Sequence, residues 1–238
     1  MADGQEKDGL SSEAGEADRR LAALEAGRRL FARECRFVAG TTTAEALPPP
    51  SLPEVAFAGR SNVGKSSLIN ALTGHSALAR VSHTPGRTQQ INFFDLGGRL
   101  MLVDLPGYGF AAVGRRQSGA WTRLIALYLR GRVRLRRLCL LVDARHGLKD
   151  SDRRTMTELD RAALSYQIVL TKADKVGAEG LAGLTRKIAA DLARHAAAHP
   201  EIIVTSAHTG QGIEALRAAL AGLAEAVPPA LSTPTPLR

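Results

Sequence analysis

The stretch Gly59-Arg60-Ser61-Asn62-Val63-Gly64-Lys65-Ser66 matches the pattern G-x-x-x-x-G-K-[ST]. It follows an apolar run at residues 54–58 and opens a segment of helical spacing, which is the strand–loop–helix context that the pattern requires. Glycines let successive backbone N–H groups curl around phosphate oxygens, and the start of the following helix adds a favourable dipole. The Lys65 ammonium suits terminal phosphates, and the Ser66 hydroxyl suits magnesium. The stretch therefore predicts a loop that holds nucleotide phosphates.

Short apolar runs alternate with segments of helical period along the middle of the chain. Six runs are predicted strands, at residues 54–58, 91–96, 100–103, 138–142, 167–170 and 202–204. Helical spacing lies between them, at residues 68–72, 121–128, 181–192 and 213–223. Strands that alternate with helices form mainly parallel sheets covered on both faces. We predict an α/β fold of the P-loop NTPase type: a three-layer α/β/α sandwich whose six-stranded sheet is mostly parallel, with one antiparallel strand.

The two ends of the chain differ in composition from this middle part. Residues 1–28 are acidic and rich in alanine, which predicts a flexible extension with a frayed helix around residues 22–29. Residues 227–238 contain four prolines and are predicted to be a disordered tail. The nucleotide-binding domain is then expected over residues 29–226.

Composition also excludes several classes of protein. No run approaches the roughly 18 apolar residues of a membrane-spanning helix, and the N-terminus lacks the features of a signal peptide. Two cysteines are too few for a disulfide framework or a zinc site. We expect a cytoplasmic monomer that does not contact a membrane.

Three further stretches follow predicted strands. Asp104-Leu105-Pro106-Gly107 has the form D-x-x-G, in which the aspartate can hold magnesium through water and the glycine N–H can contact a γ-phosphate. Thr171-Lys172-Ala173-Asp174 supplies a carboxylate, and Thr205-Ser206-Ala207 can offer a backbone N–H to the guanine carbonyl. Each stretch alone is also typical of a turn or a helix start. Together, at the carboxyl ends of strands, they predict one ligand site.

The carboxylate of Asp174 selects the base. It can accept hydrogen bonds from the ring N–H and the exocyclic amine of guanine. Adenine has an unprotonated ring nitrogen in the corresponding place, so two acceptors would face each other at a cost of several kcal/mol. The aliphatic stem of Lys172 would lie along the base. The site is therefore predicted to bind guanine nucleotides.

The chain is basic, with a formal net charge of +9, and 26 of its 32 basic residues are arginine. From Arg115 to Arg137 there are eight arginines and no acidic residue. This block predicts a surface for a polyanion, most simply RNA, with no DNA expected. The alternative is a solvated face of an arginine-rich protein.

These motifs together resemble those of the EngB (YihA/YsxC) family, which belongs to the Era-like, translation-factor-related P-loop GTPases. The resemblance covers residues 31–226 and rests on the phosphate loop and three other stretches: Thr84-Pro85-Gly86-Arg87-Thr88-Gln89, Asp104-Leu105-Pro106-Gly107-Tyr108-Gly109 and Thr171-Lys172-Ala173-Asp174-Lys175. It implies GTP and GDP as ligands, Mg²⁺ as cofactor and GTP hydrolysis. It also implies action on the large ribosomal subunit or its rRNA during assembly, and a need for normal cell division and septation.

The resemblance further implies residue roles. Lys65, Thr88 and Asn62 would act in catalysis, and Ser66 and Thr88 would hold magnesium. The effector loop would span residues 86–90, within a stretch from His75 to Gln90 that has no sustained apolar period and is typical of a switch loop. Nucleotide contacts would come from Gly59, Arg60, Ser61, Asn62, Val63, Gly64, Lys65, Ser66, Gly86, Arg87, Thr88, Gln89, Gln90, Asp104, Leu105, Pro106, Gly107, Thr171, Lys172, Ala173, Asp174, Thr205, Ser206 and Ala207.

Three positions depart from the usual GTPase pattern or extend it. Tyr108 stands where many GTPases carry the glutamine that orients the attacking water, which predicts slow intrinsic hydrolysis. Asn62 matches an asparagine that helps related GTPases coordinate potassium, which predicts hydrolysis stimulated by K⁺. Thr171 stands where most GTPases have asparagine. We expect it to lose the bridging contacts of an amide and to give modest affinity.

Two other functions stay open on the sequence alone. One is an interaction protein of the division septum in which bound nucleotide is structural. The other is a P-loop kinase, which would need an acceptor site and a lid and leaves Thr171 to Asp174 without a purpose.

Overall fold

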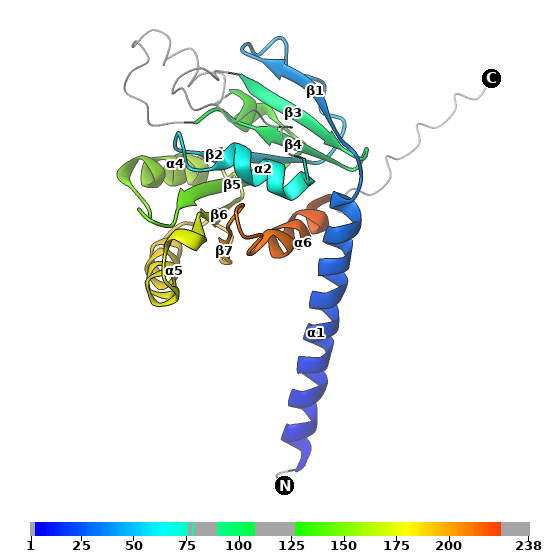
Figure 1. Ribbon diagram of the computed structural model, residues 1–238, viewed down its shortest axis with the longest axis vertical. Coiled ribbons are helices and arrows are strands. Elements are labelled where there is room, and N and C mark those ends of the chain that lie inside the picture. Colours follow the sequence, from blue (N-terminus) through cyan, green and yellow to red (C-terminus); the bar gives the residue numbers. More distant parts are fainter. Residues whose placement is uncertain (1–2, 76–77, 79–89, 108–126, 225–238) are drawn as a thin grey trace, which may run out of the picture.

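Seven strands form one sheet, in the order β1-β3-β4-β2-β5-β6-β7 (Figure 1). The structure is a computed structural model that describes residues 3–75, 78, 90–107 and 127–224, with side chains from residue 15 onward. The strands are β1 (Cys35–Thr41), β2 (Glu54–Gly59), β3 (Ile91–Leu96), β4 (Leu100–Asp104), β5 (Leu135–Asp143), β6 (Tyr166–Thr171) and β7 (Ile203–Val204). β4, β2, β5, β6 and β7 are parallel neighbours, whereas β3 is antiparallel to both β1 and β4.

The predicted fold class is confirmed, but the sheet has a seventh strand where six were expected. The additional strand is β1, which lies at the edge of the sheet beside β3. Its residues Arg36, Phe37 and Val38 are all exposed. Sequence periodicity did not reveal β1 because an edge strand with a largely exposed middle lacks the apolar alternation of a half-buried strand.

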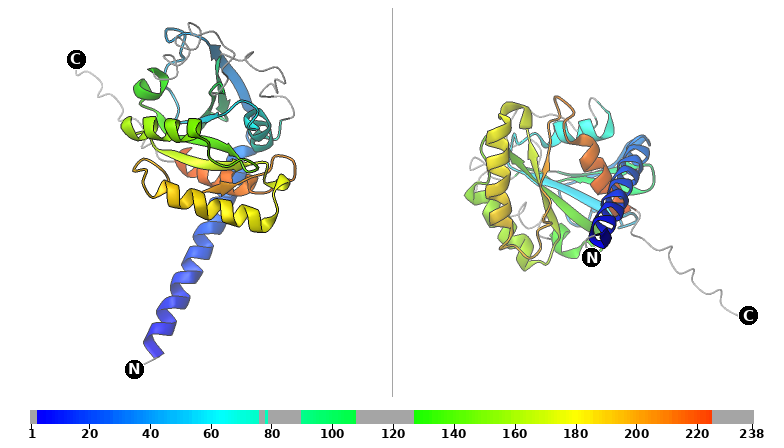
Figure 2. Two further views of the ribbon diagram at one scale, coloured as in Figure 1. Left: turned by 90° about the vertical axis from the view of Figure 1, so that its left-hand side faces the viewer. Right: turned by 90° about the horizontal axis from the view of Figure 1, so that it is seen from below.

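Helices cover both faces of the sheet, which gives the three predicted layers (Figure 2). One face is covered by α1 (Asp3–Phe31), α2 (Lys65–Thr73) and α6 (Ile213–Ala224), and the other by α4 (Asp150–Arg161) and α5 (Ala178–Leu192). The buried strand β5 serves both layers: Cys139 and Leu141 pack on the first face, and Leu140 and Val142 on the second. Each fully buried aliphatic side chain contributes about 1.5–3 kcal/mol relative to an exposed one.

The helices agree only in part with the expected positions. α2, α5 and α6 match the predicted helical spacing, but α4 was not predicted, because Met156 and Leu159 are its only buried apolar residues. The spacing expected over residues 121–128 lies outside the described residues except for its end. There, Tyr128 is buried in the core of the second face, within the helical residues 127–131.

α1 joins the domain through its C-terminal end. Leu30 and Phe31 are buried, and Gly27 lies so close to α6 that an added Cβ would be 2.6 Å from the backbone N of Ala218. The rest of α1 projects away from the sheet (Figure 1). A helix limited to residues 22–29 was expected, so the structure corrects its length; alanine, glutamate, leucine and arginine are all good helix formers. The limits of the extension and of the domain stay predictions, and the tail 227–238 lies outside the described residues.

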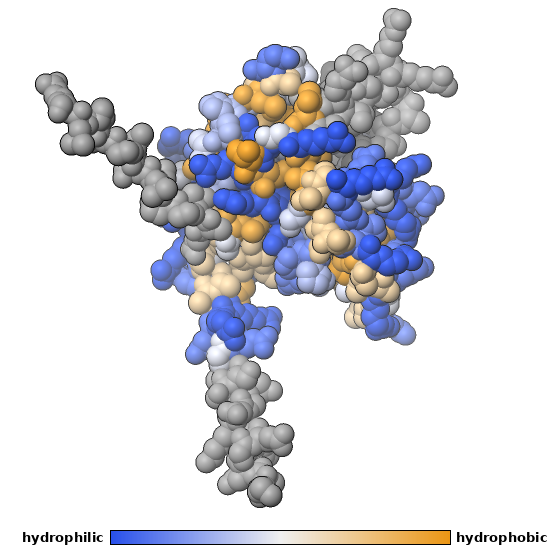
Figure 3. Space-filling model, turned by 180° about the vertical axis from the view of Figure 1, so that it is seen from behind, coloured by the Kyte–Doolittle hydropathy of each residue, from blue (hydrophilic) through white to orange (hydrophobic). Residues whose placement is uncertain are grey.

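The surface of the described part mixes polar and apolar side chains, as the face in Figure 3 illustrates. The large apolar side chains with substantial exposure are Leu21, Phe37, Val38, Leu127 and Val133. Within the described ranges, no helix combines the length and the apolar character needed to cross a membrane.

Candidate functional site

Loops from neighbouring strands meet at one edge of the sheet. β4, β2, β5 and β6 lie side by side in parallel and end at this edge. The register pairs Phe57 with Asp104, and Asp143 with Thr171. The loop after β2 and the predicted stretches after β4 and β6 therefore come together, at the carboxyl edge where open α/β sheets bind ligands.

The loop between β2 and α2 has a backbone that requires glycine. Gly64 precedes α2 with a φ of 103°, in the left-handed region. At Gly59, an added Cβ would lie 2.9 Å from Val63 Cγ1 and 3.0 Å from the Leu141 carbonyl oxygen, so a side chain there would force its neighbours to shift. Asn62 also has a positive φ, of 63°, which asparagine tolerates better than most residues. The first N–H groups of α2 lack partners within the helix, which suits an anion.

The Lys65 ammonium pairs with the Asp104 carboxylate across this edge. Both side chains are largely buried, with exposed fractions of 12% and 7%. Ser66 follows Lys65 in the first turn of α2. A hydroxyl and a carboxylate are the hard oxygen donors that Mg²⁺ prefers, so the residues present fit this ion. Thr88, the other predicted ligand, lies outside the described residues.

The segment after β4 closes against the phosphate loop. An added Cβ on Gly107 would lie 3.0 Å from Ser61 Oγ, so the glycine allows this close approach. Leu105 contributes packing, because its side chain is buried in the core of the second face and its N–H donates to the Phe57 carbonyl at 3.0 Å. The D-x-x-G glycine thus lies beside the phosphate loop, as the motif requires.

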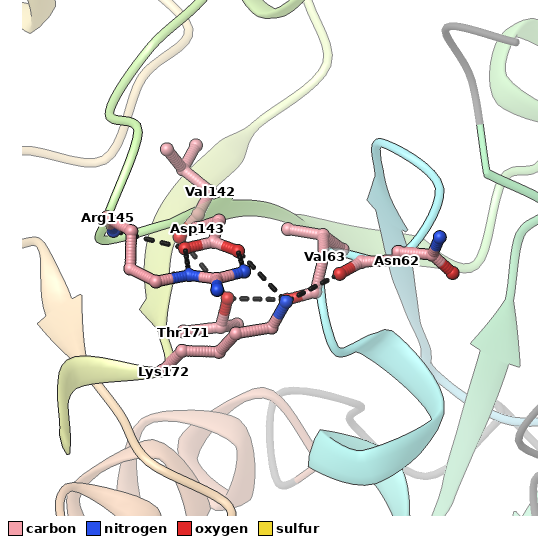
Figure 4. A network of polar contacts seen from close by, with 7 residues as sticks. All are labelled: Asn62, Val63, Val142, Asp143, Arg145, Thr171 and Lys172. Carbon is pink, nitrogen blue, oxygen red and sulfur yellow. Dashed lines mark hydrogen bonds and ion pairs between the residues drawn. The ribbon is translucent and has the colours of Figure 1, made fainter. Parts of the chain in front are cut away.

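Thr171 connects β6 with the phosphate loop. Its hydroxyl donates to the Val63 carbonyl oxygen at 2.6 Å, and Val142 O lies 3.4 Å from the same Oγ1 (Figure 4). The expectation that threonine would lose the bridging contacts of an amide is therefore wrong for the contact with the phosphate loop, whereas the modest affinity stays a prediction. A short hydroxyl replaces the amide because β6 brings Thr171 within reach of the loop.

Lys172 reaches back over the same loop. Its ammonium donates to the Asn62 carbonyl oxygen at 2.6 Å and pairs with Asp143 at 2.9 Å (Figure 4). Asp143 also accepts a hydrogen bond from the Arg145 guanidinium at 2.8 Å. Burial alone would raise the pKa of Asp143, but the hydrogen bonds from Arg145 and Lys172 outweigh it and hold this pKa far below its ordinary value. The carboxylate is charged throughout the physiological range.

Asp143 lies at the site but belongs to none of the sequence motifs that predicted it. The signal was present, because Asp143 directly follows the apolar run 138–142 in the same way that Asp104 follows its strand. The carboxyl ends of all parallel strands in the sheet meet at this edge, so every polar residue at such a position was a candidate.

Asp174 and the loop after β7 form the far end of the site. Ser206 Oγ donates to Asp174 Oδ1 at 2.7 Å, and the Ala173 N–H donates to the Thr205 carbonyl at 3.1 Å. The hydrogen bond from Ser206 and the Lys175 ammonium lower the pKa of Asp174. The carboxylate is thus held ionised, ready to accept hydrogen bonds. The structure therefore brings these two stretches together, as expected of two stretches predicted to belong to one site.

Several predicted site residues are placed differently or not described. The Arg60 guanidinium lies 3.4 Å from the buried Asp152 at the start of α4, so its side chain is directed to that helix. Gln90 packs against β1, where an added Cβ on Gly40 would be 2.2 Å from Gln90 Nε2. Gly86, Arg87, Thr88, Gln89 and Tyr108 lie outside the described residues.

The arginine block is not one uniform surface. Its first three members lie outside the described residues. Arg132 is only 7% exposed and forms an ion pair of 2.7 Å with the buried Glu54. Tyr128 donates to the same carboxylate at 2.8 Å. Arg137 donates to Gln167 at 2.9 Å, and burial lowers its pKa. Arg132 therefore cannot belong to the predicted polyanion surface, because its charge is paired with Glu54 inside the fold.

Comparison with known proteins agrees with this geometry. Residues 54–172 match the family described as 50S ribosome-binding GTPase. The chain is 54% identical over 229 residues to the protein named Probable GTP-binding protein EngB from Rhodospirillum rubrum, covering 94% of this chain and 99% of that protein. It is 56% identical over 205 residues to the protein of the same name from Hyphomonas neptunium, covering 85% and 93%.

Solved structures support the fold. A crystal structure described as a probable GTP-binding protein engB superposes with a TM-score of 0.57 at 24% identity, covering 71% of this chain and 97% of the other. Era from Aquifex aeolicus bound to GDP and AlF4⁻ gives a TM-score of 0.58 at 19% identity, covering 75% and 58%. At these identities the likeness shows the same fold.

Proposed function

The chain belongs to the EngB family of GTP-binding proteins, and from that premise we propose that it is a magnesium-dependent GTPase switch acting in assembly of the large ribosomal subunit in the cytoplasm. Family membership makes it a GTP-binding protein of a GTP-hydrolysing family. The proposal adds which residues bind nucleotide and magnesium, a slow rate of hydrolysis and the ribosomal partner. It also adds that the cell needs this protein for normal division and septation.

The observation that carries the nucleotide assignment is the convergence at one sheet edge. Backbone N–H groups before α2 would hold the phosphates, and the Lys65 ammonium, already within reach of Asp104, would neutralise their terminal charge. Asp174, held ionised by Ser206, would read the guanine N–H groups. Ser66 and, through water, Asp104 would hold magnesium, which neutralises charge on the phosphates.

Hydrolysis is proposed to be slow without a partner. Tyr108 occupies the position of the water-orienting glutamine, and a phenol does not donate and accept in one plane as an amide does.

A potassium ion is proposed to stimulate hydrolysis. Asn62 is exposed on the phosphate loop, where its carboxamide is available to such an ion. Steady-state rates of GTP hydrolysis, measured in KCl and in NaCl at equal ionic strength, test whether potassium stimulates the reaction. We expect more than about twofold stimulation by K⁺, lost in Asn62→Ala; equal rates would contradict it.

The ribosomal role is supported by charge and by the family. The chain carries a net charge of +9, and the family that matches residues 54–172 is described as ribosome-binding. The arginines of the block other than Arg132 and Arg137 remain candidates for contacting RNA phosphates. The same nucleotide site would also serve a septum protein with structural nucleotide, so the two functions differ in partner rather than in site.

Co-sedimentation with purified large ribosomal subunits tests the role. The protein bound to GDP is compared with the protein bound to a non-hydrolysable GTP analogue across a salt series. Binding that requires the GTP form and weakens steeply with salt is expected, because phosphate contacts release counterions. Equal binding in both forms would reduce the interaction to generic RNA affinity. No binding in either form would favour the septum function.

A further inference from the structure

We propose that Asp143 is a positioning residue for the base end of the nucleotide site: it fixes Lys172 across the phosphate loop so that the lysine stem forms a preformed wall for guanine. The inference rests on the proposed function, because it assumes that guanine lies between Lys172 and Asp174. It adds a residue that no sequence motif of the site includes.

The first support is the way Lys172 is held at its far end. Its ammonium lies between two acceptors, Asp143 Oδ2 at 2.9 Å and the Asn62 carbonyl oxygen at 2.6 Å. The stem crosses the loop, since an added Cβ on Gly64 would be 3.5 Å from Lys172 Cε. In Figure 4 the side chain runs from the end of β6 to these acceptors. A lysine otherwise has a flexible four-carbon stem.

The second support is the backbone of Lys172, which has a φ of 58° in the left-handed region. A non-glycine residue adopts this region only when its surroundings fix it, and such residues cluster at functional sites. The conformation starts the stem toward the phosphate loop, and Asp143 secures it there. Both ends of the side chain are therefore fixed before a nucleotide arrives.

The third support is that Asp143 is itself immobilised. The N–H and Nε of Arg145 both donate to Asp143 Oδ1 at 3.0 Å, and a guanidinium nitrogen donates to Oδ2 at 2.8 Å. The Asp143 side chain is only 5% exposed, whereas that of Arg145 is 43% exposed. The two-pronged contact fixes the plane of the carboxylate, which in turn fixes the ammonium of Lys172.

A preformed wall lowers the cost of binding, because the rotamers of Lys172 are ordered on folding rather than on association. The base is the same in GDP and GTP, so both nucleotides gain equally. Uniform binding of this kind changes affinity and leaves the rate of the bound complex unchanged. Loss of Asp143 is therefore expected to affect Kd and KM but not kcat.

A double-mutant cycle tests the inference. The affinities of nucleotide-free wild type, Asp143→Asn, Lys172→Ala and the double variant are measured for GDP and GTP by calorimetry, and kcat is measured at saturating GTP. Asp143→Asn is expected to weaken both nucleotides about 10-fold, with kcat within about twofold. The double variant is expected to bind no more weakly than Lys172→Ala alone. Wild-type affinity in Asp143→Asn, or effects that multiply in the double variant, would overturn the proposal.

Three controls separate this outcome from others. Asp150→Asn removes a carboxylate that is 94% exposed and should leave affinity unchanged. Arg145→Gln loosens Asp143 without removing it, so it should weaken nucleotide binding less than Asp143→Asn does. In the Lys172→Ala background Arg145→Gln should have no effect on binding. An effect there would contradict the proposal that Asp143 acts through Lys172, and this test remains usable if Asp143→Asn does not fold. A wild-type protein that binds neither GDP nor GTP would instead overturn the proposed function.

Discussion

The two ends of the central sheet use buried charge in opposite ways: we call the end where β2 begins, at Glu54, the closed end, and the end where β4 finishes, at Asp104, the open end. Where β2 begins, Glu54 is 1% exposed, pairs with Arg132 and accepts a hydrogen bond from Tyr128, and the Arg132 guanidinium lies over the rings of Phe93 and Tyr128. Where β4 ends, Asp104 pairs with Lys65. The first pair is buried and bonded to neighbouring groups of the protein. The second lies beside backbone N–H groups at a helix start, where an anion is favoured.

This contrast separates ion pairs that hold the fold from those that handle a ligand. At the closed end the arginine also donates to the Pro48 carbonyl at 2.6 Å, so its hydrogen-bonding capacity is used within the protein. At the open end Asp104 is paired with a lysine, Lys65, whose single ammonium can turn from the carboxylate to the phosphates. Substitutions at the closed end should therefore act on stability, and those at the open end on nucleotide affinity.

The largest expected effect is at the closed end. Arg132→Met leaves Glu54 buried without its counter-ion, which should lower the free energy of unfolding by about 3–5 kcal/mol. Chemical denaturation of the nucleotide-free protein measures this. The folded fraction should bind GDP with wild-type affinity, since the substitution lies at the end of the sheet opposite the nucleotide site. Weak GDP binding together with a normal free energy of unfolding would contradict the assignment of Arg132 to stability rather than to nucleotide binding.

The next effect is at the open end. Lys65→Ala removes the ammonium expected on the terminal phosphates and should weaken GTP binding by at least about 100-fold. Equilibrium dialysis with labelled GTP measures it. Lys187→Ala, which removes an exposed lysine of α5, serves as the matched control and should bind normally. If Lys65→Ala retained its GTP affinity, the loop 59–66 could not be the phosphate-binding part of the site.

A smaller effect is expected where the site is braced. Thr171→Val keeps the shape of the side chain but removes the hydroxyl that donates to Val63 O at 2.6 Å. One hydrogen bond contributes about 1 kcal/mol net, so GDP affinity should fall about fivefold. Stopped-flow release of a fluorescent GDP analogue would show the change as faster dissociation. If release is unchanged, the hydroxyl braces the fold without shaping the site.

The smallest effect is in the response to acid. The lowered pKa of Asp143 means that the unfolded chain binds more protons once pH falls below about 5, so the stability that this carboxylate supplies is present above its unfolded pKa and is lost as pH falls. This loss should reach about 0.3 kcal/mol at pH 4. Denaturation of wild type and Asp143→Asn at pH 6 and pH 4 measures it. The difference between them should shrink in acid; a widening difference would contradict the sign.

The sequence predicted that its motifs meet at the open end but did not predict the ion pair at the closed end. The phosphate loop, Asp104 and Asp174 belong to short motifs that follow apolar strands, so local pattern and the strand-end rule suffice to bring them together. Glu54 and Arg132 lie 78 residues apart, and nothing in the local pattern around Arg132 shows a buried partner. Its charge was therefore counted as part of a surface.

Contacts across long separations also explain the other errors. The hydrogen bond from Thr171 to Val63 spans 108 residues, so residue type alone did not show that the Thr171 hydroxyl contacts the phosphate loop where an amide was expected to be needed. The position of Asp143 after the apolar run 138–142 marked it as a candidate, but its contact with Lys172 depends on β5 pairing with β6. The edge strand β1 depends on pairing with β3 rather than on its own apolar pattern.

The central claim is that the open end of the sheet reads guanine through Asp174. Calorimetric titration of wild type and Asp174→Asn with GDP and XDP tests it most directly. Wild type should prefer GDP, and Asp174→Asn should prefer XDP, because an amide can donate to the carbonyl that replaces the guanine amine. An Asp174→Asn variant that still prefers GDP would contradict the assignment of this edge as the guanine site.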